Sequence, residues 1–315
     1  MALYSGVLGL IGNTPLVDIS SLSPNPDVQM FVKLEGMNPG GSVKDRVALS
    51  LIEDAEERGV LAPGATLLEP SSGNTGIGLA LVCRLKGYHL KVVLPGNVSP
   101  ERRQLLEVWG AEIIESPGSE GSNGAVRMAR GLAAEHPEWG FLYQYGNPAN
   151  PRAHYEGTGP EIWRDCPDVT HFVAGLGTSG TLLGVGRYLK DQRSDVQVWA
   201  VEPPSGEVVD GLRNLDDGYV PPIFSDLGGE KLLDRKTVVG PRDSIAWTRR
   251  LADVGIFAGI STGAALAGAV RCARQIERGT IVFLSPDGGW KYLSSGAWTG
   301  EIDEVAERAR HTIYF

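Results

Sequence analysis

The chain alternates between short apolar segments and segments with helical periodicity over most of its 315 residues. Strand-like runs at 28–34 and 90–94 are each followed by a segment whose apolar residues recur every three or four positions. Parallel strands need crossover connections, which are usually helices, so this order predicts mostly parallel sheets covered by helices on both faces. The expected fold class is therefore α/β, with two open, twisted sheets.

The alternation restarts after a segment rich in proline and asparagine, residues 147–151. This interruption predicts an N-terminal α/β unit, 1–150, and a C-terminal α/β unit, 151–315, and the chain is long enough for both. A long stretch between Glu202 and Thr237 is rich in glycine, proline and aspartate. A connection of that length in a compact domain is usually a functional lid or a disordered segment.

The charge balance argues against several classes of partner. The net charge is −9, from 29 basic and 38 acidic residues, which does not favour nucleic acid or an anionic membrane. The apolar runs are too short to span a bilayer, and the N-terminus lacks the pattern of a signal peptide. The cysteines Cys83, Cys166 and Cys272 and the five histidines show no metal-site spacing. We therefore expect a cytoplasmic protein that binds no metal, membrane or nucleic acid.

Lys44 stands at the start of a predicted helix, within the glycine-containing segment 38–46. The positive end of the helix dipole disfavours a cation at that position by about 0.3–1 kcal/mol. A lysine whose ammonium form is disfavoured loses its proton more readily and is better suited to a Schiff base. The alternative is a solvated lysine whose charge is offset by Asp45.

The turn 71–76 contains two serines, an asparagine and a threonine between a predicted strand and a predicted helix. Their side chains, together with backbone N–H groups beside the glycines, form a donor-rich pocket that suits a carboxylate. A simple helix cap is the alternative, but a cap needs only one serine or asparagine.

The segment 175–181 also joins a predicted strand to a helix and contains three glycines and three hydroxyl residues. Its backbone N–H groups can surround a phosphate. The same segment matches the dinucleotide fingerprint G-x-G-x-x-G, and Glu202 follows where a ribose-binding acid would lie. A nicotinamide-dependent oxidoreductase therefore competes with an enzyme that binds a phosphate monoester.

A fourth segment, 259–265, places Ser261 in a tight turn at the start of a predicted helix. Its hydroxyl could form a hydrogen bond with a ring nitrogen of a cofactor. It could equally be a simple N-cap for the helix that follows.

In this order and at these separations, the segments resemble the cysteine synthase family of fold type II pyridoxal-phosphate enzymes. The resemblance also includes 12–16 and 287–294, so it covers nearly the whole chain. It outweighs the dinucleotide interpretation of 175–180. It implies pyridoxal 5′-phosphate as the cofactor, a homodimer, and a part of residues 1–40 that packs with the C-terminal unit.

The resemblance also implies a role for each candidate site residue. Lys44 is the catalytic Schiff-base lysine. The other cofactor contacts are Asn74 at the ring hydroxyl, Ser261 at the ring nitrogen, and Gly177, Thr178, Ser179, Gly180 and Thr181 at the phosphate. The substrate carboxylate is surrounded by Ser71, Ser72, Asn74, Thr75 and Gln144.

The segment 211–221 resembles the lid of the actinobacterial O-phosphoserine-dependent cysteine synthase B branch. In that branch the arginine that matches Arg213 binds the substrate phosphate, which suits the forked guanidinium group. The alternative is a solvated loop arginine. Ser71 and Ser179 differ from the commoner residues of the family, and the tail 311–315 does not match the branch.

The resemblance therefore implies a cysteine synthase that replaces the β-substituent of an activated serine with sulfur through an aminoacrylate intermediate. O-phosphoserine is the favoured substrate and O-acetylserine the alternative. The sulfur comes from sulfide or from the thiocarboxylate of a sulfur-carrier protein, and family members also dock with serine acetyltransferase. The rival functions are a cystathionine β-synthase, a serine dehydratase, an NAD-type oxidoreductase and a non-catalytic binding protein.

Overall fold

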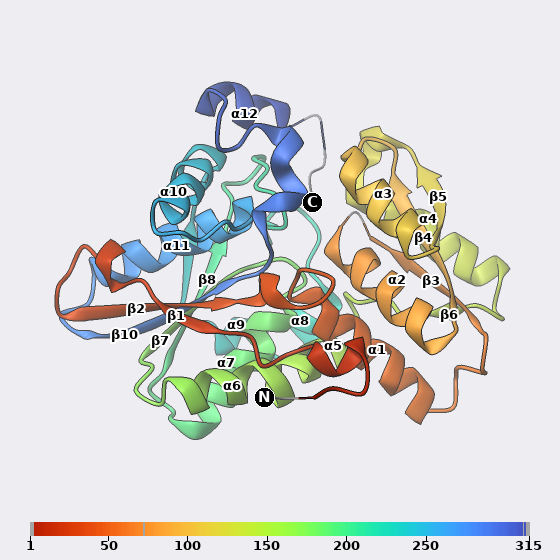
Figure 1. The fold of residues 1–315 in the computed structure, drawn as a ribbon, viewed down its shortest axis with the longest axis horizontal. Helices are drawn as coiled ribbons and strands as arrows, with labels where there is room; N and C mark the ends of the chain where they lie inside the picture. The colour runs from red at the N-terminus through yellow and green to blue at the C-terminus, as the bar shows by residue number, and fades with distance from the viewer. Residues whose placement is uncertain (1–2, 72, 311, 313–315) are drawn as a thin grey trace.

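The structure of the chain, a computed structural model, describes residues 3–71, 73–310 and 312. Its strands form two sheets flanked by helices (Figure 1). The six-stranded sheet contains, in spatial order, β1 (Leu16–Asp18), β2 (Val28–Leu34), β10 (Gly279–Ser285), β7 (His171–Gly175), β8 (Gln197–Glu202) and β9 (Arg235–Val238). The four-stranded sheet contains β5 (Glu112–Ser116), β4 (His89–Pro95), β3 (Thr66–Pro70) and β6 (Gly140–Phe141). All of these strand pairs are parallel except β1 with β2, so the predicted α/β fold with two mostly parallel sheets is confirmed.

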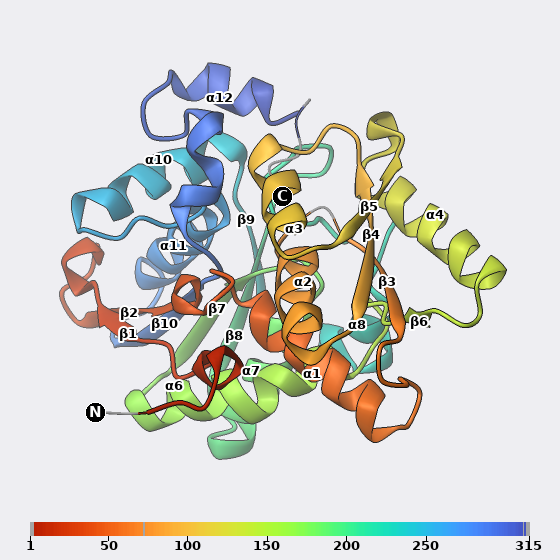
Figure 2. The same ribbon diagram turned by 45° about the vertical axis from the view of Figure 1, so that its right-hand side comes forward.

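The four-stranded sheet is buried on both faces. Its helices are α1 (Lys44–Glu57), α2 (Asn74–Lys86), α3 (Pro100–Val108) and α4 (Gly121–Glu135). The first three cover one face and α4 covers the other (Figure 2). Neighbouring Leu67 and Leu68 of β3 are both fully buried, the first against α1 and α2 and the second against α4. Successive side chains of a strand point to opposite faces, so a strand covered on both sides appears in the sequence as a continuous apolar run.

The six-stranded sheet is covered in the same way. One face packs against α10 (Pro241–Asp253) and α11 (Ile260–Ala273), and the other against α6 (Gly159–Asp165) and α7 (Gly180–Gln192). Phe283 and Val282 of β10 are fully buried on these opposite faces. A Cβ at Gly268 would lie 2.5 Å from a methyl group of Val201, so α11 approaches β8 at a distance that only glycine permits there.

Shorter elements complete the described structure. The remaining helices are α5 (Ala149–Ala153), α8 (Pro222–Asp226), α9 (Gly229–Leu232) and α12 (Ile302–Arg308). The 3₁₀ and π segments are η1 (Val7–Leu10), η2 (Ser20–Leu22), η3 (Glu35–Met37), η4 (Gly118–Glu120), η5 (His154–Thr158) and η6 (Gly289–Ser295). In the described part of the chain, no helix has the length and apolar character needed to cross a membrane.

The N-terminal strands join a sheet that is otherwise built from residues beyond 170. β2 pairs with β10 in parallel, with Val32 opposite Phe283, and β1 pairs with β2 on the outer side. The chain then crosses to the four-stranded sheet through α1. The division of the chain at residue 150 stays a prediction.

The structure differs from the sequence pattern in three places. Residues 140–145 have the composition of a strand and are predicted as one, but β6 ends at Phe141 because Tyr143 has a left-handed backbone with φ 49° that a strand cannot contain. The stretch 149–165, for which no element is predicted from the sequence, forms α5, η5 and α6. The stretch after Glu202 is not structureless, since it contains α8, α9 and β9.

Candidate active site

Two adjoining cavities lie at the carboxyl ends of the parallel strands, where α/β folds commonly bind ligands. Both are lined by Lys44, Gly177, Thr178, Gly211 and Leu212. The first also contains most of the predicted substrate contacts, namely Ser71, Asn74, Thr75, Gln144 and Arg213. The second also contains Ser179, Thr181 and Ser261. The structure therefore brings together predicted site residues that are up to 217 positions apart in the chain.

Lys44 is the first residue of α1, as predicted, and lines both cavities. Burial lowers the pKa of its amine to about 8, although the charges of Asp287 and Glu35 oppose this shift. Burial is therefore the main cause of the shift, whereas the sequence argument had named only the helix dipole. A lysine with this pKa carries a substantial fraction of free amine near neutral pH.

A second lysine at the site, Lys291, is buried and fully hydrogen-bonded. Burial also lowers its pKa to about 8. Its Nζ donates to the carbonyl oxygens of Gly40 and Gly41, at 3.1 and 3.2 Å, and to Oδ1 of Asn74, at 2.6 Å. Because all three of its N–H groups have acceptors, this ammonium is held in place, whereas Nζ of Lys44 has no hydrogen-bond partner among the described residues. Of the two, Lys44 is the amine that is free to react.

The side-chain amide of Asn74 is held in one orientation. Its Oδ1 accepts from Lys291, and its Nδ2 donates to Oδ2 of Asp287 at 2.8 Å. The hydroxyl of Tyr292 donates to the same carboxylate oxygen, also at 2.8 Å. One N–H of the Asn74 amide remains available toward the cavity that this residue lines. Sequence analysis did not single out Lys291 or Asp287, which lie in a segment used only for the family resemblance.

The turn after β3 has both a capping role and a ligand-facing role. Oγ of Ser71 accepts from the backbone N–H groups of Gly73 and Gly76, at 3.2 and 2.9 Å, so the capping alternative holds for this residue. Thr75 faces the cavity and donates from Oγ1 to Oε1 of Gln144 at 2.6 Å. Ser72, also predicted as a substrate contact, lies outside the described residues.

A buried carboxylate supports the far side of the pocket. Glu69 is fully buried at the end of β3 and accepts from the backbone N–H groups of Tyr143, at 2.7 Å, and Gln144, at 3.1 Å. Burial raises the pKa of this carboxyl group to about 8, although the two N–H groups oppose the shift. Glu69 thus holds the left-handed turn that directs Gln144 into the cavity. An acidic residue inside an apolar strand is a signal that sequence analysis passed over.

The segment 177–181, termed the phosphate loop below, leads into the first turn of α7. A Cβ at Gly177 would lie 2.8 Å from the carbonyl oxygen of Gly211, and a Cβ at Gly180 would lie 1.9 Å from Oδ1 of Asn150. Both positions therefore require glycine. Gly180 packs against Asn150 and is absent from both cavity linings, while the rest of the loop faces the second cavity. The start of a helix and a row of small residues suit a phosphate group.

The second cavity also contains a buried hydroxyl with an unsatisfied hydrogen bond. Ser261 lies in the first turn of α11 and is 2% exposed. Its Oγ has no hydrogen-bond partner among the described residues, so it does not act as a helix cap. A buried polar atom without a partner is costly and indicates a ligand. A phosphate loop and an unpartnered hydroxyl in one cavity with a free lysine fit pyridoxal phosphate, the cofactor that the sequence resemblance implies.

Arg213 lines the first cavity without an acidic partner. No carboxylate lies within ion-pair distance of its guanidinium group in the described chain, and none of the described residues lining either cavity is acidic. The guanidinium carbon instead lies 4.6 Å from the ring centre of Tyr219 and 5.6 Å from that of Tyr145. Sequence analysis missed both tyrosines because their aromatic character alone does not distinguish them from core residues. An unpaired arginine beside a cavity is suited to an anion.

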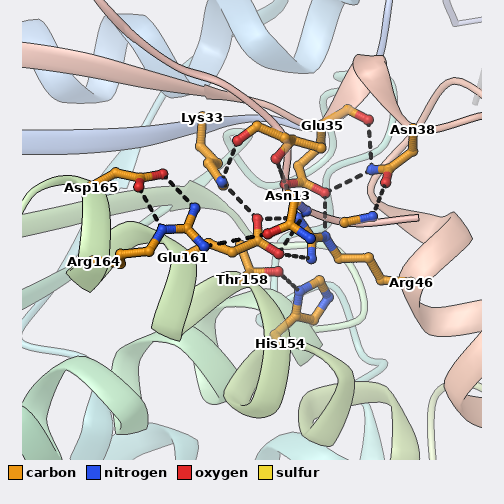
Figure 3. Close-up of polar contacts among 12 residues, drawn as sticks. Asn13, Lys33, Glu35, Asn38, Arg46, His154, Thr158, Glu161, Arg164 and Asp165 are labelled. Carbon is orange, nitrogen blue, oxygen red and sulfur yellow. Dashed lines mark hydrogen bonds and ion pairs between the residues drawn. The ribbon is translucent and has the colours of Figure 1, made fainter. Parts of the chain in front are cut away.

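Beneath the start of α1 lies a buried ionic cluster formed by Lys33, Glu35, Arg46 and Glu161 (Figure 3). Nε and Nη1 of Arg46 lie 2.7 Å from carboxylate oxygens of Glu35 and Glu161, respectively. Nζ of Lys33 lies 2.7 Å from the other oxygen of Glu161. The cluster connects β2, α1 and α6 directly behind the first turn of the helix that carries Lys44.

His154 is the one histidine in the described chain that is fully enclosed near the site. Burial, followed by the charges of Arg46 and Lys44, holds the pKa of its imidazole well below its usual range. Its Nε2 lies 3.3 Å from Oγ1 of Thr181 in the phosphate loop. No group of three or more histidine, cysteine, aspartate or glutamate side chains within 3–71, 73–310 and 312 could hold a metal ion.

Comparisons with known proteins agree with this geometry. Residues 7–287 match the family described as "Pyridoxal-phosphate dependent enzyme". The chain is 44% identical over 293 residues to cysteine synthase B of Salmonella typhimurium, covering 92% of this chain and 95% of that protein. Its structure resembles O-ureido-L-serine synthase, with a TM-score of 0.88, 38% identity and coverage of 95% and 96% of the two chains. It also resembles O-acetyl serine sulfhydrylase isoform 3 of Entamoeba histolytica, with a TM-score of 0.86, 34% identity and coverage of 98% and 96%.

Proposed function

The chain belongs to the pyridoxal-phosphate dependent enzyme family and is a cysteine synthase, and we propose that the activated serine it uses is O-phosphoserine. The observation that carries this choice is Arg213, a cation that lines the substrate cavity and has no acidic partner among the described residues. A phosphate ester brings a dianionic group that a guanidinium can bind through two parallel hydrogen bonds, whereas an acetate ester is neutral.

The residues around the cavities divide into cofactor and substrate contacts. Lys44 would hold the cofactor covalently, the phosphate loop its phosphate, Ser261 its ring nitrogen and Asn74 its ring hydroxyl. When bound, pyridoxal phosphate supplies an aldehyde that joins an amine and a ring that delocalises negative charge from the α-carbon of the substrate. Ser261 offers this ring a hydroxyl rather than a carboxylate, so it does not hold a proton on the ring nitrogen, which favours β-replacement over transamination.

The chemical steps assigned to the chain begin with orientation of the substrate. The turn 71–75 and Gln144 hold the substrate carboxylate so that the Cα–H bond points at Lys44. Once the amine of the substrate has taken the place of Lys44 on the cofactor, the released Lys44 amine would take the α-proton. The bond between the β-carbon and oxygen breaks, and phosphate leaves with the electron pair while Arg213 balances its charge. Sulfide adds to the β-carbon, and Lys44 returns the proton to the α-carbon to give cysteine.

The segment 205–225, termed the lid below, protects these steps from water. Three of its residues, Gly211, Leu212 and Arg213, line the first cavity. A lid that closes over the reacting groups excludes water from an intermediate that water would otherwise hydrolyse. The same segment therefore carries the residue that selects the leaving group.

We propose a homodimer in the cytoplasm, with sulfide or the thiocarboxylate of a sulfur-carrier protein as the sulfur donor and with serine acetyltransferase as a further docking partner. We also propose that 1–150 and 151–315 form separate units. Each is built around its own sheet, except that β1 and β2 of the first unit belong to the sheet of the second.

The test compares cysteine formation from O-phosphoserine and from O-acetylserine, each with sulfide. In Arg213→Gln, kcat/KM for O-phosphoserine should fall about 10- to 100-fold, because a hydrogen bond to a charged group contributes about 1.5–3 kcal/mol. The value for O-acetylserine should stay within about threefold, since that ester has no charge for the arginine to bind. Arg84→Gln removes the same charge from the exposed surface of α2 and is the matched control. A wild-type enzyme that prefers O-acetylserine would refute the substrate assignment.

A further inference from the structure

Two tyrosines join the lid to the body of the protein at the edge of the pocket. The hydroxyl of Tyr143, just beyond β6, lies 2.8 Å from the hydroxyl of Tyr219, in the lid. We propose that this pair, the tyrosine clasp, holds Arg213 in position and is thereby a determinant of selectivity for the phosphorylated substrate. This inference rests on the proposed function and adds positioning residues to it.

The lid side of the clasp carries Arg213 directly. The guanidinium carbon of Arg213 lies 4.6 Å from the ring centre of Tyr219, and the ring of Tyr145 meets that of Tyr219 edge-on at 5.7 Å. Aromatic faces attract a guanidinium without occupying its N–H groups in the ring plane. The polar contact of the guanidinium with Oδ1 of Asn123 is long, at 3.4 Å. The tyrosine rings therefore position the cation, and apart from the contacts with Asn123 and the Tyr145 hydroxyl its N–H donors remain available for an anion.

The body side of the clasp is fixed by backbone bonds. Tyr143 has φ 49°, a conformation that costs free energy for a residue with a large side chain. It is held there by Glu69, which accepts from the N–H groups of Tyr143 and Gln144. Arg130 stabilises the outer end, because its Nη2 donates to the Tyr143 hydroxyl at 2.7 Å. The phenol group thus has a fixed place that the lid can bind.

The same turn links the clasp to the bound substrate. Gln144 follows Tyr143 immediately and accepts a hydrogen bond from Thr75 in the cavity. The side chain of Glu69 therefore positions both Gln144, a proposed contact of the substrate carboxylate, and Tyr143, to which the lid is bound. One buried turn therefore positions the residues at both ends of the substrate, Gln144 at its carboxylate and Arg213 at its phosphate.

The main chain at Arg213 does not depend on the clasp. Its N–H donates to the carbonyl oxygen of Leu176 at 2.7 Å, beside the phosphate loop. Removing one tyrosine hydroxyl should therefore release the side chain of Arg213 without unfolding the lid. This separation makes a change in substrate selectivity the expected result, rather than a general loss of activity.

The experiment is a double-mutant cycle on the holoenzyme with Tyr143→Phe, Tyr219→Phe and the double variant. Each single change breaks the bond between the two hydroxyls, and Tyr143→Phe also removes the bond from Arg130. Loss of the shared bond should raise KM for O-phosphoserine about five- to tenfold, the size expected for one hydrogen bond. The kcat for that substrate and KM for O-acetylserine should each change by less than about twofold, because the reacting groups stay in place. The double variant should be no worse than the worse single variant, since both changes break the same bond. Tyr155→Phe, which loses an exposed hydrogen bond to Asp191, is the matched control.

Several outcomes would overturn the inference. Additive effects of the two changes would show that the hydroxyls act separately, and equal losses with both esters would show a general effect on the lid. A third check adds Tyr219→Phe to the Arg213→Lys variant. In that variant the tyrosine change should no longer alter the ratio of KM for O-phosphoserine to KM for O-acetylserine. If Arg213→Gln lowers the preference for O-phosphoserine but the clasp variants do not, only the clasp is wrong. If neither set of variants affects that preference, the substrate assignment itself fails.

Discussion

Lys44 and Arg46 lie two positions apart at the start of α1, yet their surroundings are opposite. Arg46 is buried among carboxylates, with Glu35 and Glu161 each 2.7 Å away. Although burial opposes it, these partners hold the pKa of Arg46 above its usual range. Nζ of Lys44 has no hydrogen-bond partner among the described residues, and burial lowers its pKa. Pairing, rather than burial, therefore separates a cation that stabilises the fold from one that reacts.

The geometry of the helix explains how neighbours can differ so much. Residues two apart on a helix point about 200° apart, so one side chain faces the cavity while the other faces η3 and α6. The ionic cluster ties down the first turn of α1 from behind. The bonds of Arg46 therefore fix the segment that carries Lys44, and the Lys44 side chain does not need to form hydrogen bonds itself to be held in place.

Removing the unpaired cation should affect chemistry and spare stability. In Lys44→Ala, cysteine formation should fall at least about a thousandfold, because the amine is both the cofactor anchor and the proton acceptor. The free energy of unfolding of the apoenzyme, measured with denaturant, should stay within about 1 kcal/mol or rise, since a buried cation without a partner is itself destabilising. Lys231→Ala changes an exposed lysine and serves as control. Cysteine formation that survives Lys44→Ala would refute the assigned role.

Removing the paired cation should have the reverse effect. Arg46→Met leaves Glu35 and Glu161 buried without their main partner, and the free energy of unfolding should fall by about 3–5 kcal/mol. The surface ion pair of Arg242 and Asp303 offers the control, because Arg242→Met should cost less than about 1 kcal/mol. Similar losses in the two variants would show that the buried cluster contributes no more than a surface pair.

The pH dependence of stability should also report the ionic cluster. Burial by itself would raise the pKa of Glu161, but hydrogen bonds and charge from Arg46, with help from Lys33, lower it to about 2 from the ordinary 4.5. The folded state therefore binds this proton less readily than the unfolded state does. The associated stability is present above pH 4.5 and lost as the pH falls toward 2, by about 3 kcal/mol.

Denaturant titrations between pH 2 and 6 measure this loss. Glu161→Gln should flatten the curve in that window, whereas Glu304→Gln, on the exposed face of α12, should leave it unchanged. A wild-type curve as flat as that of Glu161→Gln would contradict the assignment.

The smallest effect concerns the rate at which the apoenzyme takes up its cofactor. Only the unprotonated Lys44 amine can join the aldehyde, and burial lowers its pKa to about 8. The rate of growth of the visible absorption band should rise about tenfold between pH 6 and 7 and level off above about pH 8. A rate that keeps rising to pH 10 would instead indicate a lysine with an ordinary pKa.

Much of the site could be predicted because its residues follow local rules. The turn 71–76 and the phosphate loop each lie between an apolar strand and a helical pattern, and parallel strands bring such loops to one edge. Lys44 was recognisable because a cation at a helix start breaks a local preference. Glu69, Tyr145, Tyr219 and Lys291 were not recognisable in this way, because each acts through a contact with a distant part of the chain.

The same distinction applies to the fold. The strands with continuous apolar runs were placed correctly, but β6 was predicted too long because nothing local signals that Tyr143 adopts a left-handed backbone. That conformation depends on Glu69, which lies 74 positions earlier. The short helices between 149 and 165 were missed because their apolar residues contact several elements and so show no single period.

Local sequence is enough to predict the order of strands and helices, the loops that contain glycine and hydroxyl residues, and the position of Lys44 at a helix start. These features depend on neighbours within a few residues, through side-chain periodicity and backbone preference. Which of the two cations is paired depends instead on the three-dimensional fold. Arg46 finds its carboxylates 11 and 115 positions away and Lys44 finds none in the described chain, because electrostatic pairing depends on distance in space.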